Sequence, residues 1–489
     1  MSRILKVLGV LALALLLLVV PGAEPVVPEA PERGVDFAWD QDAYWASLEQ
    51  QFVTTRDQGC GAVGPGGSEE LLAVRRALGQ LTAETLPPDA VVLDSIEQRF
   101  FELAPLVAAC AELAEPYAGL QMFLRDVIKD QSRHWDMRSP VARERAYRLL
   151  YGSRLAVEEV ILQHPERVPA LQQGRNERRL LPSVEVAGVR IHSGDLLVSR
   201  GGYPTSALIA RGSDFPGNFS HVALVHVDST TGVASAIEAL IDRGVTITTP
   251  DAYLADKKLR IMVLRPRGDL PAIEADPLLP HRAATRMLER ARTERIRYDF
   301  AMDYTDPEAL FCSEVASSVY REEGVVLWTG LSTISAPGLR RWLAAFGVEH
   351  FETQEPSDLE YDPQLDVVAE WRDPAALMTD RIDNAVIDAM LEGADAGDEL
   401  SFSRGQLPVA RLAKGWSWGL NRVGLRGPIP EGMSARSALQ NRAFTERQRR
   451  IAAEVTVLAE AFREQLGYAP PYWTLVGLAR EATGRHPAT

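Results

Sequence analysis

Cys312 lies in a sequence context that favours a reactive thiol. It follows the polar, turn-prone residues 303–306 and opens a stretch to about Glu323 whose apolar residues recur at helical spacing. The sulfur is therefore expected at the start of a helix, where unpaired backbone N–H groups and the helix dipole stabilise a thiolate. Such a cysteine acts as a nucleophile when a base lies within reach. The competing interpretation is a buried structural cysteine, which is common for this residue type.

His221 is the histidine best placed to be that base. It lies in the β-rich stretch Phe219–His226, and a second such stretch, Ala234–Leu240, follows after a short turn. If the hairpin closes symmetrically about its turn, opposed residue numbers sum to 459 and His221 faces Glu238 on a shared face. A carboxylate there can accept from one imidazole nitrogen and leave the other facing the thiol. The inference depends on the register, because a slip of one residue would move Glu238 to the opposite face.

The other histidines fit this chemistry less well. His226 is separated from His221 by an odd number of residues, so it points to the other side of the strand. A conventional order, with the base after the nucleophile, leaves only His350 and His486 and offers no obvious third member. His221 alone would be read as a satisfied core histidine, but its combination with Cys312 and Glu238 favours a catalytic set.

Motifs for other chemistries are weak. Gly415–Gly419 spells the Gly-x-Ser-x-Gly elbow of serine hydrolases, but the residues before it are not strand-like and only His486 follows. We interpret it as a chance match, with Trp416 and Trp418 as packing or interface residues. The sequence has no His-Glu-x-x-His motif and no phosphate-binding loop, so we expect neither a metal nor a cofactor.

Composition narrows the class of protein. The 489 residues carry 52 Lys and Arg against 67 Asp and Glu, a formal net charge of −15. A chain this acidic is a poor nucleic-acid binder, because phosphates need clustered cations. Three cysteines are too few for a disulfide-dense scaffold.

The N-terminus reads as an export signal. Arg3 and Lys6 flank the apolar run Val7–Val20, which is followed by Pro21-Gly22-Ala23. The run is short for a membrane span of about 20 residues, so we favour a cleaved signal over an anchor. We expect an exported protein of the periplasm or cell envelope. An uncleaved segment would instead hold it at the membrane.

Export also bears on the remaining cysteines. In an oxidising compartment Cys60 and Cys110 could form a disulfide that ties the glycine-rich stretch 59–67, expected as a loop, to a helix. Two unpaired thiols are the alternative, because the sequence does not give the Cα separation.

The spacing of apolar residues divides the chain into helical flanks around a β-rich centre. Short β-rich stretches, among them 184–191, 195–199 and 260–264, run on without alternating helices, which favours an α+β domain with a mostly antiparallel sheet. The expected segments are a signal peptide (1–23), a Pro-rich tether (24–36), a helical N-terminal region (37–180), the α+β domain (181–350), an acidic linker (351–376) and a helical C-terminal region (377–489).

The motifs together resemble one enzyme family. Residues 193–197 (SGDLL), 220–225 (SHVALV), 237–239 (IEA) and 311–315 (FCSEV) are similar to the permuted papain-like amidases, the YaeF/YiiX branch of the NlpC superfamily. In that family the histidine and a polar residue precede the cysteine. The resemblance covers roughly residues 190–345 and implies a permuted papain-like fold, with Cys312 as nucleophile, His221 as base and Glu238 as the orienting residue.

The predicted function is thus that of an exported cysteine hydrolase that cleaves an amide bond through an acyl-enzyme on Cys312. Cell-wall peptides are one candidate substrate class. The same branch includes lipid-directed relatives similar to lecithin:retinol acyltransferase, so an acyl-lipid hydrolase or acyltransferase with the same triad is the alternative. A non-catalytic envelope scaffold is the third interpretation.

Overall fold

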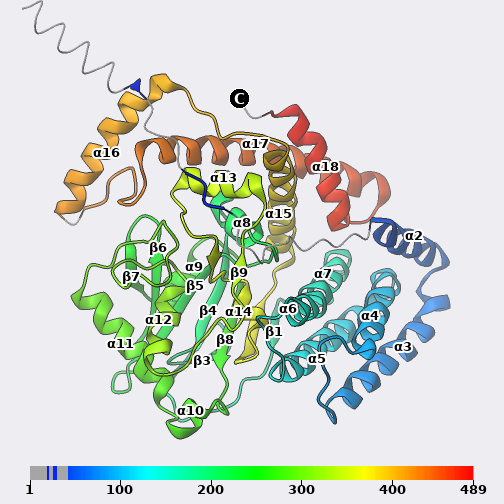
Figure 1. Cartoon of the computed structure of the whole chain (residues 1–489). Coiled ribbons are helices and arrows are strands. Elements are labelled where there is room, and N and C mark those ends of the chain that lie inside the picture. Colours follow the sequence, from blue (N-terminus) through cyan, green and yellow to red (C-terminus); the bar gives the residue numbers. More distant parts are fainter. Residues whose placement is uncertain (1–18, 21–25, 30–41, 424, 488–489) are drawn as a thin grey trace, which may run out of the picture.

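A computed structural model describes residues 19–20, 26–29, 42–423 and 425–487. Figure 1 shows a central sheet with helices of the N-terminal third packed on one side of it and the C-terminal helices above it. The expected signal (1–23) and tether (24–36) lie largely outside the described residues and stay predictions. None of the helices in the described ranges combines the length and apolarity needed to cross a bilayer.

The N-terminal region is a set of helices around its own apolar core. Leu78, Phe100, Val107, Tyr117 and Leu124 recur at helical spacing and are all buried in it. The helices are α2 (Asp42–Gln58), α3 (Cys60–Leu81), α4 (Val91–Ala109), α5 (Ala114–Ser132), α6 (Pro140–Tyr147) and α7 (Ser153–Gln163).

The glycine-rich stretch 59–67 is not a loop, as expected from its composition, but the first turns of α3. Cys60 begins this helix and Cys110 caps the end of α4. The structure joins the two in a disulfide with their Cα atoms 5.1 Å apart. The bridge holds together the ends of two helices that also pack along their lengths.

The central element is a seven-stranded sheet in which every neighbouring pair is antiparallel. Its strands, in spatial order, are β1 (Leu171–Gln173), β11 (Leu365–Trp371), β8 (Lys258–Pro266), β4 (Leu196–Gly201), β5 (His221–Val227), β6 (Ala234–Leu240) and β7 (Gly244–Thr248). The sheet and its flanking helices confirm the α+β class, with helical regions on either side of a papain-like domain.

Different elements pack on the two faces of the sheet. One face, here the helix face, carries Val222 and Leu224 and packs against α11 (Leu279–Thr293) and α12 (Glu314–Glu322). The other, the hairpin face, carries Ala223 and Val225 and packs against α9 (Pro250–Ala255) and the β2–β3 hairpin.

That hairpin corrects one expectation. Residues 184–191 are not a single strand but the pair β2 (Ser183–Val186) and β3 (Val189–His192). Ala187 and Gly188 have φ of 47° and 80°, so the chain reverses in the two-residue turn that best matches strand twist.

The acidic segment 351–376 is not a linker. Its residues 365–371 form β11, an inner strand of the sheet between β1 and β8. The acidic side chains Glu360 and Glu370 are buried there against Arg125, Arg154 and Arg372, which are also buried. We call these five residues the ionic cluster. Buried charges require such partners. Because Arg125 is on α5, Arg154 on α7 and Glu370 on β11, the N-terminal helices and the sheet share one interior.

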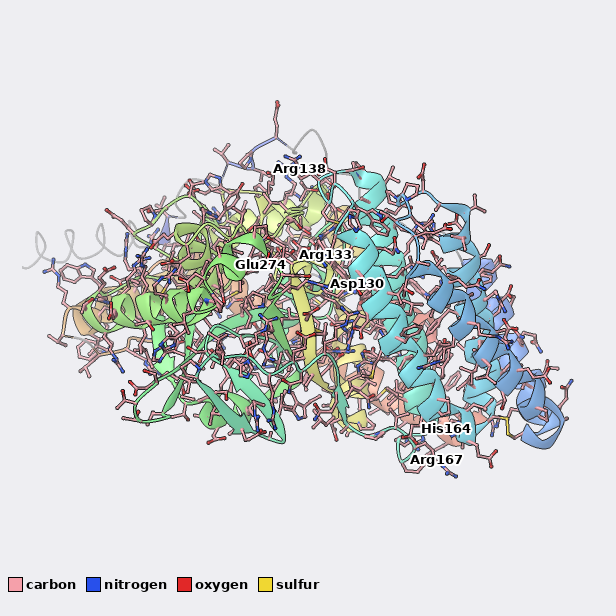
Figure 2. All side chains as sticks on the ribbon, turned by 90° about the horizontal axis from the view of Figure 1, so that it is seen from below. Asp130, Arg133, Arg138, His164, Arg167 and Glu274 are labelled. Carbon is pink, nitrogen blue, oxygen red and sulfur yellow. A yellow bond between two sulfur atoms is a disulfide. The ribbon has the colours of Figure 1, made fainter. Side chains whose placement is uncertain are left out.

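Further ion pairs lie along this boundary. Asp130 accepts from Arg175 at 2.6 Å and pairs with Arg267 at 2.9 Å, and Arg133 pairs with Asp269 at 2.8 Å. Figure 2 shows Asp130 and Arg133 where the N-terminal helices meet the central region.

The C-terminal region is helical and packs on a third apolar core. Its long helices are α15 (Pro374–Asp395), α16 (Leu407–Arg422), α17 (Ala435–Leu466) and α18 (Tyr472–Arg485). The elbow-like residues 415–419 lie within α16, and the Ser417 hydroxyl donates to the Ala413 carbonyl. No strand precedes this serine in the helix, so the serine-hydrolase geometry does not form there.

Candidate active site

Glu238 and His221 are brought together by the β5–β6 hairpin. Glu238 Oε2 lies 2.6 Å from His221 Nε2, and both side chains are mostly buried. The register differs from the symmetric one, since Glu238 is directly opposite Ala223 and the opposed numbers sum to 461. His221 and Glu238 are therefore diagonal neighbours. A shift of two residues preserves the shared face, and diagonal neighbours are within reach of long side chains.

The hydrogen bond fixes which imidazole nitrogen is available. Nε2 is held by the carboxylate, and Nδ1 has no hydrogen-bond partner among the described residues. This is the arrangement in which a carboxylate orients an imidazole and leaves its second nitrogen for proton transfer.

Cys312 lies in the turn that leads into α12, two residues before the first helical residue. Glu314 reaches back to accept from the Phe311 backbone N–H at 2.9 Å, which stabilises the start of the helix as a capping box does. The side chain of Cys312 is 5% exposed. Its Sγ is 3.9 Å from the Ser220 carbonyl oxygen, so the sulfur lies beside the backbone next to His221.

The thiol and the imidazole are not hydrogen bonded in this structure. α12 packs on the helix face, against Val222 and Leu224, whereas His221 alternates with them along β5. Ala223, which shares the face of His221, packs on the hairpin face, so α12 does not cover the face that carries the imidazole. Cys312 approaches the base from beside the strand rather than from above its side chain.

Burial keeps the resting thiol protonated. It raises the pKa of Cys312 to about 12, against smaller lowering effects of the Val222 backbone N–H and the Ser313 hydroxyl. Burial also raises the pKa of Glu314 to about 8 and that of Glu355 well above its usual range. Glu355 contributes to the raised thiol pKa, so we place it near the sulfur. Nucleophilic attack from this state needs a base that removes the thiol proton.

Two residues that the sequence interpretation did not single out complete the surroundings of His221. Ser199 is directly opposite His221 on β4, and its hydroxyl is 2.7 Å from the Tyr253 hydroxyl. The Tyr253 ring is stacked on the imidazole with centroids 6.2 Å apart. Ser199 ends a strand that the alternation predicts, so its position could have been found once β4 and β5 were paired. Tyr253 is on the short helix α9, which no pattern indicated.

Two buried donors near His221 have no hydrogen-bond partner among the described residues. They are Asn218 Nδ2 and the Ser220 hydroxyl, both in the segment that leads into β5. Buried polar groups are normally paired, so an unpaired donor beside a nucleophile is a candidate for holding substrate oxygen.

The other histidines do not join this group. His226 stacks on His281 with centroids 5.3 Å apart, and His281 Nδ1 lies 2.8 Å from the Ser193 hydroxyl. His350 faces Asp303 at 3.8 Å. Across the described part of the chain, no group of three or more His, Cys, Asp or Glu side chains could hold a metal ion.

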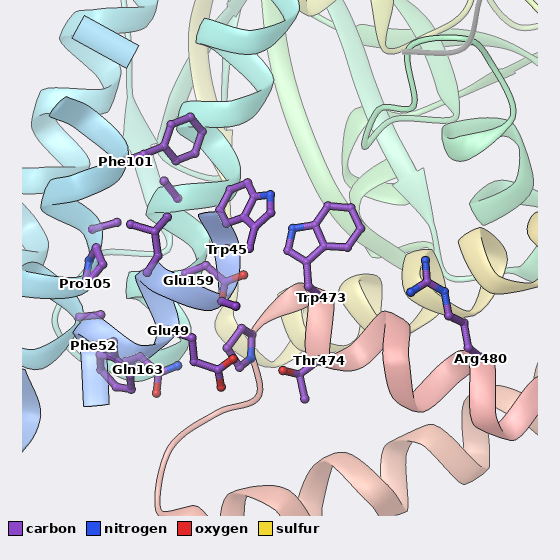
Figure 3. A pocket seen from close by; sticks show the side chains of 16 residues that line it. Trp45, Glu49, Phe52, Phe101, Pro105, Glu159, Gln163, Trp473, Thr474 and Arg480 are labelled. Carbon is purple, nitrogen blue, oxygen red and sulfur yellow. The ribbon is translucent and has the colours of Figure 1, made fainter. Parts of the chain in front are cut away.

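An apolar cavity of about 360 Å³ lies elsewhere, between the N-terminal helices and α18. Figure 3 shows Trp45, Phe101 and Trp473 around it. None of Cys312, His221 or Glu238 lines it.

The fold and the site define an α+β domain of hydrolase type, and the comparison with protein families agrees. Residues 190–369 match the family described as permuted papain-like amidase enzyme, YaeF/YiiX, C92 family. This confirms the resemblance for the segment that holds all three candidate residues, and the family indicates a hydrolase of the papain-like amidase type. The matched segment extends through most of β11, in line with its place in the sheet.

One solved structure is similar to part of this chain. It is described as the metalloprotein yiiX from Escherichia coli O157:H7, DUF1105, and is 18% identical. The match covers 37% of this chain and 97% of that chain, with a TM-score of 0.29. No curated protein matches this chain.

Proposed function

We propose that the protein is a cysteine hydrolase of the cell envelope that cleaves an amide bond, with Cys312 as nucleophile, His221 as base and Glu238 as the residue that orients the base. The observation that carries the proposal is the His221–Glu238 hydrogen bond directly beside a cysteine at a helix start. The family match supports the reaction class.

The proposed steps are those of a cysteine nucleophile with a histidine base. His221 Nδ1 takes the proton of the Cys312 thiol as the sulfur attacks the carbonyl carbon of the substrate. The C–N bond then breaks, the amine leaves with the proton from the imidazolium, and a thioester remains on Cys312. Water, deprotonated by His221, hydrolyses the thioester and restores the thiol. Glu238 stabilises the imidazolium through Nε2–H, and we assign donation to the oxyanion to Asn218 Nδ2 or the Ser220 hydroxyl because both are buried and lack a partner among the described residues.

Trapping the acyl-enzyme tests the proposal. The full chain is incubated with a panel of peptide amides and acyl esters, quenched in acid, digested and analysed by mass spectrometry. We expect an acyl adduct on the peptide that contains Cys312, and no adduct or turnover in Cys312→Ala or His221→Ala. Ser318→Ala is the matched control, because its hydroxyl only donates to the Glu314 carbonyl within α12. Turnover that survives in Cys312→Ala, with the fold intact by circular dichroism, would overturn the assignment.

A further inference from the structure

Helix α16 exposes an apolar stripe to solvent. Val409, Leu412 and Trp416 recur at spacings of three and four residues, which places them on one side of the helix, and Val423 directly follows its last residue. Each is at least 66% exposed. The opposite side carries the buried residues Ala410 and Ser417, which attach the helix to the body of the protein. We call the four exposed residues the α16 stripe.

The charged residues in the sequence around the stripe are all basic, although in the fold Arg426 pairs with Asp242 at 3.6 Å and Lys414 donates to the Pro430 and Glu431 carbonyls. The segment from Leu400 to Pro430 contains five cations and no acidic residue, in a chain whose net charge is −15. The cations are Arg404, Arg411, Lys414, Arg422 and Arg426. The Arg422 guanidinium lies over the exposed ring of Trp418, 4.0 Å from its centroid.

We propose that α16 lies on an anionic lipid surface, with the α16 stripe in the acyl boundary and the basic residues at the headgroups. Aliphatic side chains and tryptophan on a helix that is otherwise basic match the two layers of a bilayer interface. The exposed cations Arg404 and Arg422 favour an anionic surface over a purely apolar partner protein, because juxtaposed basic side chains are attracted to anionic headgroups.

The N-terminal end of the described chain is attached to the same helix. Arg411 Nη2 donates to the Val20 carbonyl at 2.6 Å. Val20 is the last residue of the apolar run that begins at Val7. The point where that run ends and the α16 stripe therefore meet on one edge of the molecule, and Figure 1 shows α16 at the outer margin, away from α18 and the N-terminal helices.

The segment that follows α16 leads back toward the candidate active site. The loop after α16 places Gly432 against the Phe300 ring, where a Cβ would clash. Phe300 packs edge-on against Tyr298, and Tyr298 packs on the apolar core that includes Val315 of α12, the helix that follows Cys312. Docking of α16 would thus hold this side of the site near the bilayer.

Vesicle binding of the full chain tests the proposal. Leu412→Glu/Trp416→Glu changes the α16 stripe, and Leu72→Glu/Val457→Glu is the matched control, since it makes the same change in charge at exposed sites on α3 and α17. In co-sedimentation with vesicles of 30% phosphatidylglycerol in phosphatidylcholine, we expect the stripe variant to bind at least tenfold more weakly. The control should differ from wild type by less than twofold. Arg404→Gln and Arg422→Gln should each weaken binding about fivefold, the equivalent of about 1 kcal/mol per cation.

A local probe separates this helix from the rest of the chain. Gly415→Cys and Gly79→Cys, both exposed helical positions with open space around them, are labelled with a nitrobenzoxadiazole dye in the Cys312→Ala background. The dye at 415 should shift to the blue with anionic vesicles but not with phosphatidylcholine alone, and the dye at 79 should not shift. Sedimentation without a shift at 415 would assign binding to another segment and overturn the proposal. So would a stripe variant that changes the oligomeric state and leaves lipid binding unaltered.

Discussion

The ionic cluster and the Cys312 site both bury ionisable groups in one interior, yet in opposite charge states. In the cluster, burial acts to raise the pKa of Glu370, but Arg154 and Arg372 lower it overall well below its usual range. Around Cys312, burial prevails and raises the pKa of the thiol, of Glu314 and of Glu355, which favours their protonated forms. The difference is the presence of a cationic partner. Paired charges fix the position of helices and strands, whereas unpaired groups keep protons that a reaction can move.

The largest expected effect is loss of a cluster partner. Arg154→Met leaves Glu360 and Glu370 buried without their shared guanidinium, and breaking such a pair costs about 3–5 kcal/mol. Urea unfolding at pH 7, followed by circular dichroism, measures the loss. Arg485→Met is the control, because its pair with Glu454 is half exposed and is worth less than about 1 kcal/mol. Equal losses in the two variants would show that the cluster is no more structural than a surface pair.

The two regions should respond to pH in opposite directions. The pKa of Glu314 is about 8 in the folded protein and about 4.3 in an unfolded chain, so the folded state binds more protons between these values. Stability therefore falls as pH rises through this window. Glu314→Gln, which keeps an acceptor for the Phe311 N–H, should be more stable than wild type at pH 8 by a few kcal/mol.

The comparison variant is Glu370→Gln. Because the folded pKa of Glu370 is depressed, its contribution is present above its unfolded pKa and is lost as pH falls. The Glu370→Gln variant should be less stable than wild type at pH 7, and the gap should narrow on acidification. Unfolding free energies in urea between pH 4 and 8 give the slope for Glu314→Gln, and measurements extended below pH ~4.3 give the slope for Glu370→Gln. A constant offset for either variant over its own pH range would contradict the assigned charge states.

Sequence patterns predict which strands and helices form the site better than they predict which face of the sheet each element packs on. Alternation in β5 and β6 gives the hairpin, and the helical pattern after Cys312 gives α12. The register was two residues away from the symmetric one because a sequence does not determine how many residues a turn uses. The shared face of His221 and Glu238 survived because two is a whole period of the strand.

The rest depends on partners that are remote in the chain. The sequence did not indicate β11, because its buried acid Glu370 is neutralised by Arg125 and Arg154, more than 200 positions away. In the same way, the helix face and the hairpin face are both apolar along β5, so nothing in the strand says which one α12 covers. Glu355 and Tyr253 come near the site only through the packing of whole elements.

A smaller effect is expected from the residue that orients the base. Glu238→Gln retains an acceptor for His221 Nε2–H but loses the charge that stabilises the imidazolium, so kcat/KM should fall about tenfold to hundredfold. His221→Ala should cost more, because it removes the group that transfers the proton. Rates of amide cleavage for both variants, with unfolding curves as a check on the fold, decide the order. A larger loss in Glu238→Gln would assign proton transfer to another residue.

The smallest expected change is in the alkylation rate of Cys312, which distinguishes a neutral resting thiol from a thiolate–imidazolium pair. In this structure Sγ contacts the Ser220 carbonyl and the Ser313 hydroxyl but not His221, and burial raises the thiol pKa to about 12. Iodoacetamide should therefore label Cys312 slowly at pH 7, at a rate that grows with pH. His221→Ala should change that rate by less than about twofold while it abolishes turnover, because the base acts only once substrate is bound.

The urea-unfolded chain is the reference for this measurement, since its free thiol titrates near pH ~8.5 and should be labelled faster at every pH below that. Peptide mass spectrometry across pH 5–9 reads the rates. Rapid labelling near pH 6 that disappears in His221→Ala would show a thiolate–imidazolium pair already formed at rest. The Cys312 site would then resemble the ionic cluster, because a charged partner would stabilise the thiolate. The proposed difference in charge state between the two regions would be wrong.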